Sequence, residues 1–107
     1  MVTNDKIYLG TELKLNINIE PIGGATMSSY DWEVEMYCTP SKSQKILKAD
    51  AVEIDDNNYV VMVDTNAIGT GALRCKLTAA IVDADFSDFK RNEVVVIDTG
   101  IQIVKPF

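Results

Sequence analysis

The central pattern of the chain is NYVVMVDTNAIGTGALRCKLTAA, at residues 58–80. In its second half apolar and polar side chains alternate strictly, and the apolar positions are Leu73, Cys75, Leu77 and Ala79. A period of two residues is typical of an antiparallel strand with one buried face. We therefore expect residues 59–63 and 72–79 to pair as a β-hairpin. Because a single hairpin is not stable in water, other parts of the chain must cover its apolar face.

The same alternation recurs on both sides of this stretch. Turn-forming residues separate the alternating segments about every ten residues. The predicted strands are residues 7–9, 13–19, 30–38, 93–97 and 101–104. Residues 44–54 show a weaker pattern of one or two short edge strands, with lysines that deter edge-to-edge pairing. Residues 41–43 are expected to form an exposed loop.

Seven to eight short strands without a long helix predict an all-β fold. The expected architecture is an antiparallel immunoglobulin-like β-sandwich, with a small barrel as the alternative. Trp32 favours the sandwich, because it lies on the third strand and faces the later hairpin. Residues 1–107 are enough for one domain with a single core.

The connection within residues 58–80 predicts a single helical turn. Asp64 or Thr65 is suited to cap this turn, and Gly69 is suited to end it. We expect Ile68 to face inward and to plug the space beneath the sandwich.

The two cysteines do not follow the immunoglobulin disulfide pattern. That bridge joins the second strand to the sixth, whereas Cys38 follows the tryptophan on the third. Both Cys38 and Cys75 fall on the apolar side of alternating segments. We therefore expect two buried, reduced thiols.

The charge balance excludes two classes of partner. Ten basic and 16 acidic residues give a net charge of −6, whereas binding to nucleic acid or to an anionic membrane requires a concentrated Lys/Arg surface. No apolar run approaches the roughly 20 residues of a membrane span, and the first residues, MVTNDK, are too polar to begin a secretory signal. We expect an intracellular or assembly-delivered protein, although a chain trimmed of its signal would look the same.

The chain contains no histidine. This excludes Ser-His-Asp and Cys-His catalysis and the commonest zinc sites. Paired carboxylates for glycoside hydrolysis are present at Asp31 and Glu33, but the alternation places both on the solvated face of a strand. We therefore predict no enzyme activity, no catalytic residue, no cofactor and no metal site.

Aspartates gather in one loop, at Asp83, Asp85 and Asp88, and carboxylate oxygens are ligands of calcium. A second group lies at residues 55–57. Neither has the EF-hand spacing, which requires glycine at the sixth position and glutamate at the twelfth. We expect solvated turns at both places, and weak calcium binding at the first group stays open.

Two pairs of residues are candidate partner contacts. Phe86 and Phe89 stand in a polar loop, where they either fold back as a lid on the core, the favoured interpretation, or stay exposed for a partner. Arg74 and Lys76 form a small positive stripe on the polar face of the predicted hairpin. That stripe is complementary in charge to the acidic loop of a neighbouring copy.

The order of several segments resembles a known family. The segments are NYVVMVDT at 58–65, LRCKL at 73–77, DADF at 83–86, RNEV at 91–94 and TGIQI at 99–103. Together they resemble small β-sandwich proteins of phage and prophage tail modules, in particular the N-terminal immunoglobulin-like domain of baseplate upper proteins. The likeness covers most of the chain.

This resemblance implies a structural role without chemistry. A module of this family packs against other copies of itself or against other tail proteins, and no family catalytic residue exists to carry over. It also implies a component of the virion tail that is made in the bacterial cytoplasm. Family members are often the first domain of a longer fibre or receptor-binding protein.

A second hypothesis comes from a different class of function. A carbohydrate- or ligand-binding sandwich of the adhesin type would use an exposed aromatic platform. The aromatic residues available for it are Tyr30, Tyr37, Phe86 and Phe89. A hydrolase is the third and least favoured hypothesis.

Overall fold

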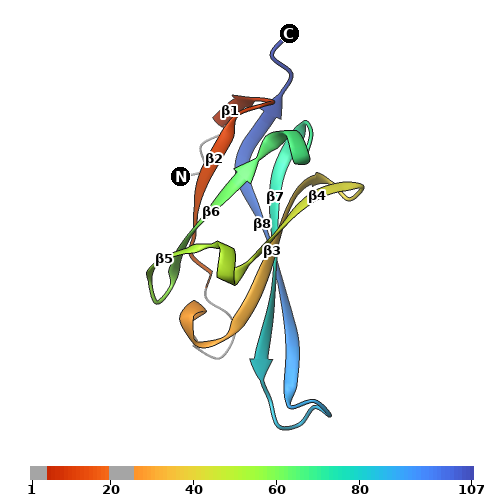
Figure 1. Cartoon of the computed structure of the whole chain (residues 1–107). Helices are drawn as coiled ribbons and strands as arrows, with labels where there is room; N and C mark the ends of the chain where they lie inside the picture. The colour runs from red at the N-terminus through yellow and green to blue at the C-terminus, as the bar shows by residue number, and fades with distance from the viewer. Residues whose placement is uncertain (1–4, 20–25) are drawn as a thin grey trace.

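The computed structural model describes residues 5–19 and 26–107, and its regular elements there are β-strands in two sheets and short 3-10 turns (Figure 1). In spatial order, the larger sheet contains β1 (Asp5–Tyr8), β8 (Lys90–Val104), β7 (Gly71–Val82), β3 (Asp31–Thr39) and β4 (Lys42–Leu47). The smaller sheet contains β2 (Glu12–Ile17), β6 (Asn58–Asp64) and β5 (Val52–Asp55). Three short 3-10 turns connect them: η1 (Met27–Ser29), η2 (Lys48–Asp50) and η3 (Thr65–Ala67). The all-β prediction is confirmed.

The larger sheet is mixed, so the prediction of wholly antiparallel pairing is wrong. β1 runs parallel to the end of β8, from Asp5 opposite Ile101 to Tyr8 opposite Val104. The other strand pairs are antiparallel. A parallel pair needs a long connection, and β1 and β8 have nearly the whole chain between them.

The predicted hairpin over residues 58–80 is also wrong. Both of its strands exist, but β6 lies in the smaller sheet and β7 in the larger one. The connection crosses the roughly 10 Å between the two packed sheets, and it does so through η3. Alternation alone therefore identified the strands without identifying their neighbours.

The predicted features of that connection are confirmed. The Asp64 side chain accepts a hydrogen bond from Asn66 N at 3.0 Å, and this caps η3. Gly69 ends the turn with a φ of +91°, in the left-handed region that favours glycine. Ile68 is fully buried, so its side chain closes this end of the core.

The core lies between the two sheets, and Trp32 joins them. The indole of Trp32 on β3 packs edge-on against Tyr59 of β6, with ring centroids 5.0 Å apart. Its Nε1 donates a hydrogen bond to Met27 O at 3.1 Å. Trp32 is therefore the core anchor that the sequence predicts. The four alternating apolar residues of β7 are all buried as well: Leu73, Cys75, Leu77 and Ala79.

Two other boundaries differ from expectation. Lys42 and Ser43 belong to β4, because a tight turn pairs Thr39 with Lys42 and leaves no room for the predicted loop. Residues 93–97 and 101–104 form the single strand β8 instead of two strands. A register shift accommodates Thr99 and Gly100, where Thr99 Oγ1 donates to Leu73 O at 2.8 Å and Gly100 has a φ of +77°.

The two weak edge strands are confirmed, with β4 at one edge of the larger sheet and β5 at one edge of the smaller.

The molecule is elongated, because β7 and β8 extend beyond the sandwich (Figure 1). Its extents are 53 × 28 × 25 Å and its radius of gyration is 14.8 Å, compared with about 13 Å for a compact domain of this length. β3 covers β7 only from Arg74 to Ala80. Past that point β7 and β8 pair with each other alone, and residues 81–91 form a projecting arm.

Candidate functional site

The arm ends in a tight loop that its own backbone closes. Asp83 N donates to Phe89 O at 2.8 Å, and inside the loop Phe89 N donates to Phe86 O at 2.9 Å. Phe89 has a φ of 61°, a conformation that a bulky residue adopts at a cost of about 1 kcal/mol. Glycine or asparagine would hold this turn at lower cost. The loop therefore carries an aromatic side chain at a position where turn geometry alone does not favour one.

The structure leaves both loop phenylalanines exposed, so the lid interpretation is wrong. Phe86 is 49% exposed and Phe89 is 65% exposed. They belong to the loop between β7 and β8, at the tip of the arm that extends past the sandwich (Figure 1). Of the two interpretations of this pair, exposure toward a partner is the one that agrees with their positions.

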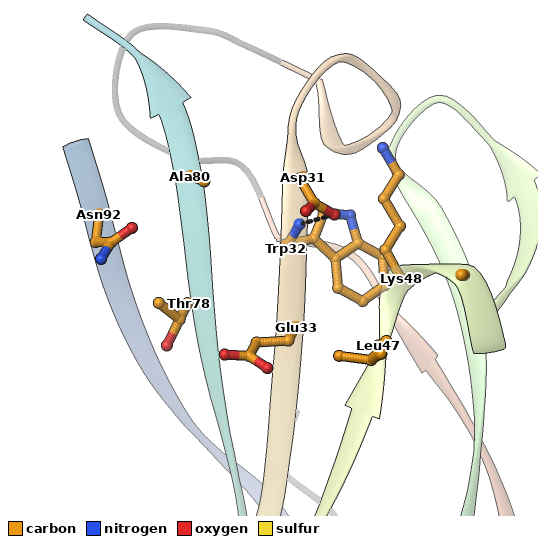
Figure 2. Close-up of a pocket in the computed structure, with 9 residues that line it drawn as sticks. Asp31, Trp32, Glu33, Leu47, Lys48, Thr78, Ala80 and Asn92 are labelled. Atoms are coloured by element: carbon orange, nitrogen blue, oxygen red, sulfur yellow. Dashed lines mark hydrogen bonds between the residues drawn. The ribbon is translucent and has the colours of Figure 1, made fainter. Parts of the chain in front are cut away.

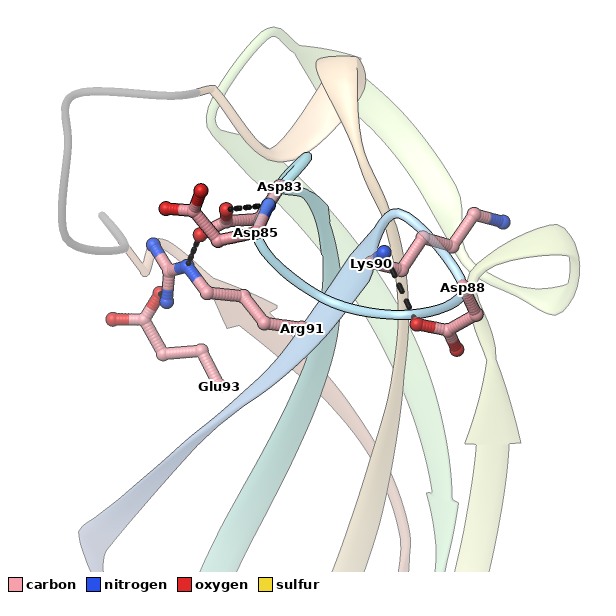
Figure 3. A network of polar contacts seen from close by, with 6 residues as sticks. All are labelled: Asp83, Asp85, Asp88, Lys90, Arg91 and Glu93. Carbon is pink, nitrogen blue, oxygen red and sulfur yellow. Dashed lines mark hydrogen bonds and ion pairs between the residues drawn. The ribbon is translucent and has the colours of Figure 1, made fainter.

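A polar network joins the two strands at the base of the loop (Figure 3). Arg91 Nε lies 3.1 Å from Asp83 Oδ2, and Arg91 Nη1 lies 3.3 Å from Glu93 Oε2. All three side chains are partly buried. The Arg91–Asp83 pair joins β8 to the residue that follows β7, whereas Arg91 and Glu93 both lie on β8. The first pair therefore ties the two ends of the loop together.

The acidic loop uses its carboxylates to hold its own shape. Asp83 Oδ1 accepts a hydrogen bond from Asp85 N, and Asp88 Oδ1 accepts one from Lys90 N (Figure 3). Within residues 5–19 and 26–107, no group of three or more His, Cys, Asp or Glu side chains is placed to hold a metal ion. Turn formation accounts for the carboxylates of Asp83 and Asp88.

The second acidic group is also a turn. Asp55 Oδ1 accepts hydrogen bonds from Asn58 Nδ2 at 2.7 Å and from Asn57 N at 3.0 Å. These bonds, that from Asn58 first, lower the pKa of the Asp55 carboxyl below its usual value. Asp56 Oδ1 accepts from Ser28 Oγ at 3.1 Å.

On the outer face of the larger sheet, each of three neighbouring strands presents side chains of a different kind. β3 contributes acidic side chains, β7 contributes Arg74 and Lys76, and β8 contributes apolar ones. Lys76 lies opposite Glu35, and Arg74 lies opposite Asp98. The predicted positive stripe therefore exists, but acidic neighbours on the same sheet offset its charge.

Val94 and Val96 form the apolar column of β8, and sequence reasoning missed them. Val94 is 53% exposed and Val96 is 55% exposed. The signal was present in the run Val94-Val95-Val96-Ile97, because successive residues of a strand point to opposite faces and some of these side chains must face outward. With Val82, Phe86 and Phe89, they make the β7–β8 ribbon rich in exposed apolar surface.

A shallow groove of about 450 Å³ also opens on this outer face (Figure 2). Its lining includes Asp31, Glu33 and Asn92. Asp31 Oδ1 accepts from Trp32 N at 3.0 Å, and Glu33 Oε2 lies 3.7 Å from Lys45 Nζ. Both carboxylates considered for hydrolysis therefore have structural partners.

The four aromatic residues considered for a carbohydrate platform do not come together. Tyr30 is buried beside the start of β3, and Tyr37 is half-buried near its end. Phe86 and Phe89 lie at the tip of the arm. The four candidate partner contacts also lie in two separate places. Arg74 and Lys76 are on β7, and about eight residues of β7, or roughly 25 Å, separate Arg74 from the loop that carries Phe86 and Phe89.

Burial raises the pKa of several tyrosine and cysteine side chains. The thiols of Cys38 and Cys75 are both free, and Cys75 is buried as expected. Cys38 is only half-buried, so the expectation of burial is wrong for that residue. Burial raises the pKa of Cys75 to about 11. Burial, and to a lesser degree the charge of Glu93, raises the pKa of Tyr30. Burial raises the pKa of Tyr59 to about 12, and a hydrogen bond of 2.6 Å to Glu53 adds to this effect. All of these groups are neutral at physiological pH, which suits structural roles.

No helix in the described part of the chain is long and apolar enough to span a membrane. Comparison of the sequence with protein-family models and with curated proteins, and of the structure with solved structures, found no match.

Proposed function

We propose that this domain is a non-enzymatic structural module that works through protein–protein contacts, as a component of a phage tail or baseplate. Its partners are copies of itself or other tail proteins. The observation that carries the proposal is the β7–β8 ribbon, which keeps Val82, Val94, Val96, Phe86 and Phe89 exposed. Its far end, residues 81–91, projects from the sandwich (Figure 1). Exposed apolar residues gathered on one ribbon mark interaction sites more often than apolar residues scattered singly do.

The arrangement of the strands supports an immunoglobulin-like architecture. In that fold one sheet contains strands B, E and D, and the other contains C, F and G with an added C′. β2, β6 and β5 occupy the first set of places, and β3, β7, β8 and β4 occupy the second. Trp32 on β3 stands where immunoglobulin domains carry their core tryptophan. This agreement supports the resemblance to the N-terminal domain of baseplate upper proteins.

Light scattering and a glycan array together test the proposal. A structural module should self-associate or bind another tail protein, and it should give no signal on the array. Genes for tail assembly beside the coding sequence would support the same conclusion. A chain that stays monomeric and binds glycans would instead identify a carbohydrate-binding module.

A further inference from the structure

Much of β8 lies at an open edge of the larger sheet. β1 pairs with β8 only from Ile101 to Val104. In the described ranges no other strand adds to that side of β8, while β7 pairs with its other side from Lys90 to Asp98. An unpaired edge presents backbone donors and acceptors that can pair with another chain.

One hydrogen bond sets which residues face that edge. Asp83 N donates to Phe89 O at 2.8 Å, so these two residues stand at a hydrogen-bonded position of the ladder, with one of its two bonds made. In an antiparallel ladder such pairs alternate, and the unbroken register places the next ones at Arg91, Glu93, Val95 and Ile97 of β8. The residues between them direct their backbone N–H and C=O groups away from β7. We call them the β8 edge: Lys90, Asn92, Val94, Val96 and Asp98.

The β8 edge lacks most of the features that protect sheet edges. The edge strands β2, β4 and β5 span six, six and four residues, and shortness is one such protection. The centre of the β8 edge is instead valine, which strongly favours strands. Charge is confined to its two ends, with Lys90 at one and Asp98 at the other.

We propose that the β8 edges of two copies of this chain pair antiparallel about a two-fold axis at Val94. This inference rests on the proposed function, since it names a second copy as the partner. In this register Val94 faces Val94, Asn92 faces Val96, and Lys90 of each copy faces Asp98 of the other. The larger sheets then form one continuous sheet, and the outward backbone groups of both edges are satisfied.

Charge selects this register over the neighbouring one. A two-fold axis at Val95 would place Asn92 opposite Asp98 and Lys90 opposite Gly100, and both ion pairs would be lost. Lys90, Val94 and Asp98 all lie on the outer face of the sheet, because their positions differ by even numbers of residues. Opposite charges directly across a strand pair stabilise it, and like charges destabilise it.

Sedimentation velocity on charge-reversed variants tests the register. K90D and D98K should each weaken the dimer about tenfold or more, because two attractive pairs become repulsive. An equimolar mixture of K90D and D98K should dimerise again, because both ion pairs reform between the unlike copies. The double variant K90D/D98K should dimerise alone. A mixture that associates no better than either variant would overturn the proposal.

A proline variant tests the backbone pairing. Val94→Pro removes one outward N–H and leaves the β7 ladder intact, so it should abolish dimerisation while thermal melting shows a folded domain. Val94→Thr keeps the N–H and the branched side chain, and it should still dimerise. If Val94→Pro does not fold, the charge mixture decides alone.

The outcomes separate this inference from the proposed function. If the chain self-associates and none of the β8 variants changes that association, the β8 pairing is wrong but the proposed structural module is not contradicted. Glycan binding by a monomer would overturn both.

Discussion

Replacing Ile68 by alanine should destabilise the domain by about 3 kcal/mol. Ile68 is 1% exposed and closes the core at the point where the chain crosses between the sheets. Alanine would remove three buried carbons and leave a cavity that η3, held by the Asp64 cap, cannot easily close. For a chain of this length the loss corresponds to a fall of about 10–15 °C in the melting temperature.

Circular dichroism during thermal and urea unfolding measures this loss, and Ile54→Ala is the matched control. Ile54 is the same residue type but is 60% exposed on β5, so its truncation should cost about 0.5 kcal/mol or less. If the free energies of unfolding of the two variants differ by less than about 1 kcal/mol, then Ile68 does not fill the end of the core where the chain crosses between the sheets.

Three further predictions concern other parts of the fold. Thr65→Val should cost about 1–3 kcal/mol in urea unfolding, because Thr65 Oγ1 accepts from Gly10 N and donates to Thr11 O; an unchanged midpoint would refute this. The folded-state pKa of Tyr59 is raised to about 12 from 10.0, so its contribution to stability is intact below pH 10 and is lost as pH rises toward 12. Tyr59→Phe should flatten that decline, and an equally steep decline would refute the assignment. Phe89→Asn should raise the free energy of unfolding by about 0.5–1 kcal/mol, because asparagine tolerates the positive φ at lower cost; a loss of stability would restore the lid interpretation.

Local periodicity predicted the strands well, because each strand of a sandwich has one buried face. The alternation around Trp32 and along β7 identified both strands and their inward side chains. The sequence also predicted the Asp64 cap and the Gly69 end of η3, because the start and end of a helical turn depend on residues only a few positions apart.

The sequence pattern did not predict which strands pair with one another. After Asp64 the chain can either turn back beside β6 as a hairpin or cross to the other sheet. The alternation of apolar and polar residues in β6 and β7 is the same in both cases. The parallel pairing of β1 depends on β8, about 95 residues away, and leaves no local pattern.

The candidate site was predicted in part. Phe86, Phe89, Arg74 and Lys76 stood out by residue type, and the structure places them on exposed or half-buried surface. Their separation along β7, and the acidic neighbours of Lys76, follow from register. The β8 edge was missed because its open side depends on how short β1 is.

Amide hydrogen exchange at single-residue resolution, at low and at high protein concentration, tests the central claim most directly. We predict that the amides of Val94 and Val96 exchange more slowly as concentration rises, while those of the β5 edge, such as Ile54, do not change. Exchange at Val94 and Val96 that is the same at both concentrations would contradict the pairing of two copies through β8.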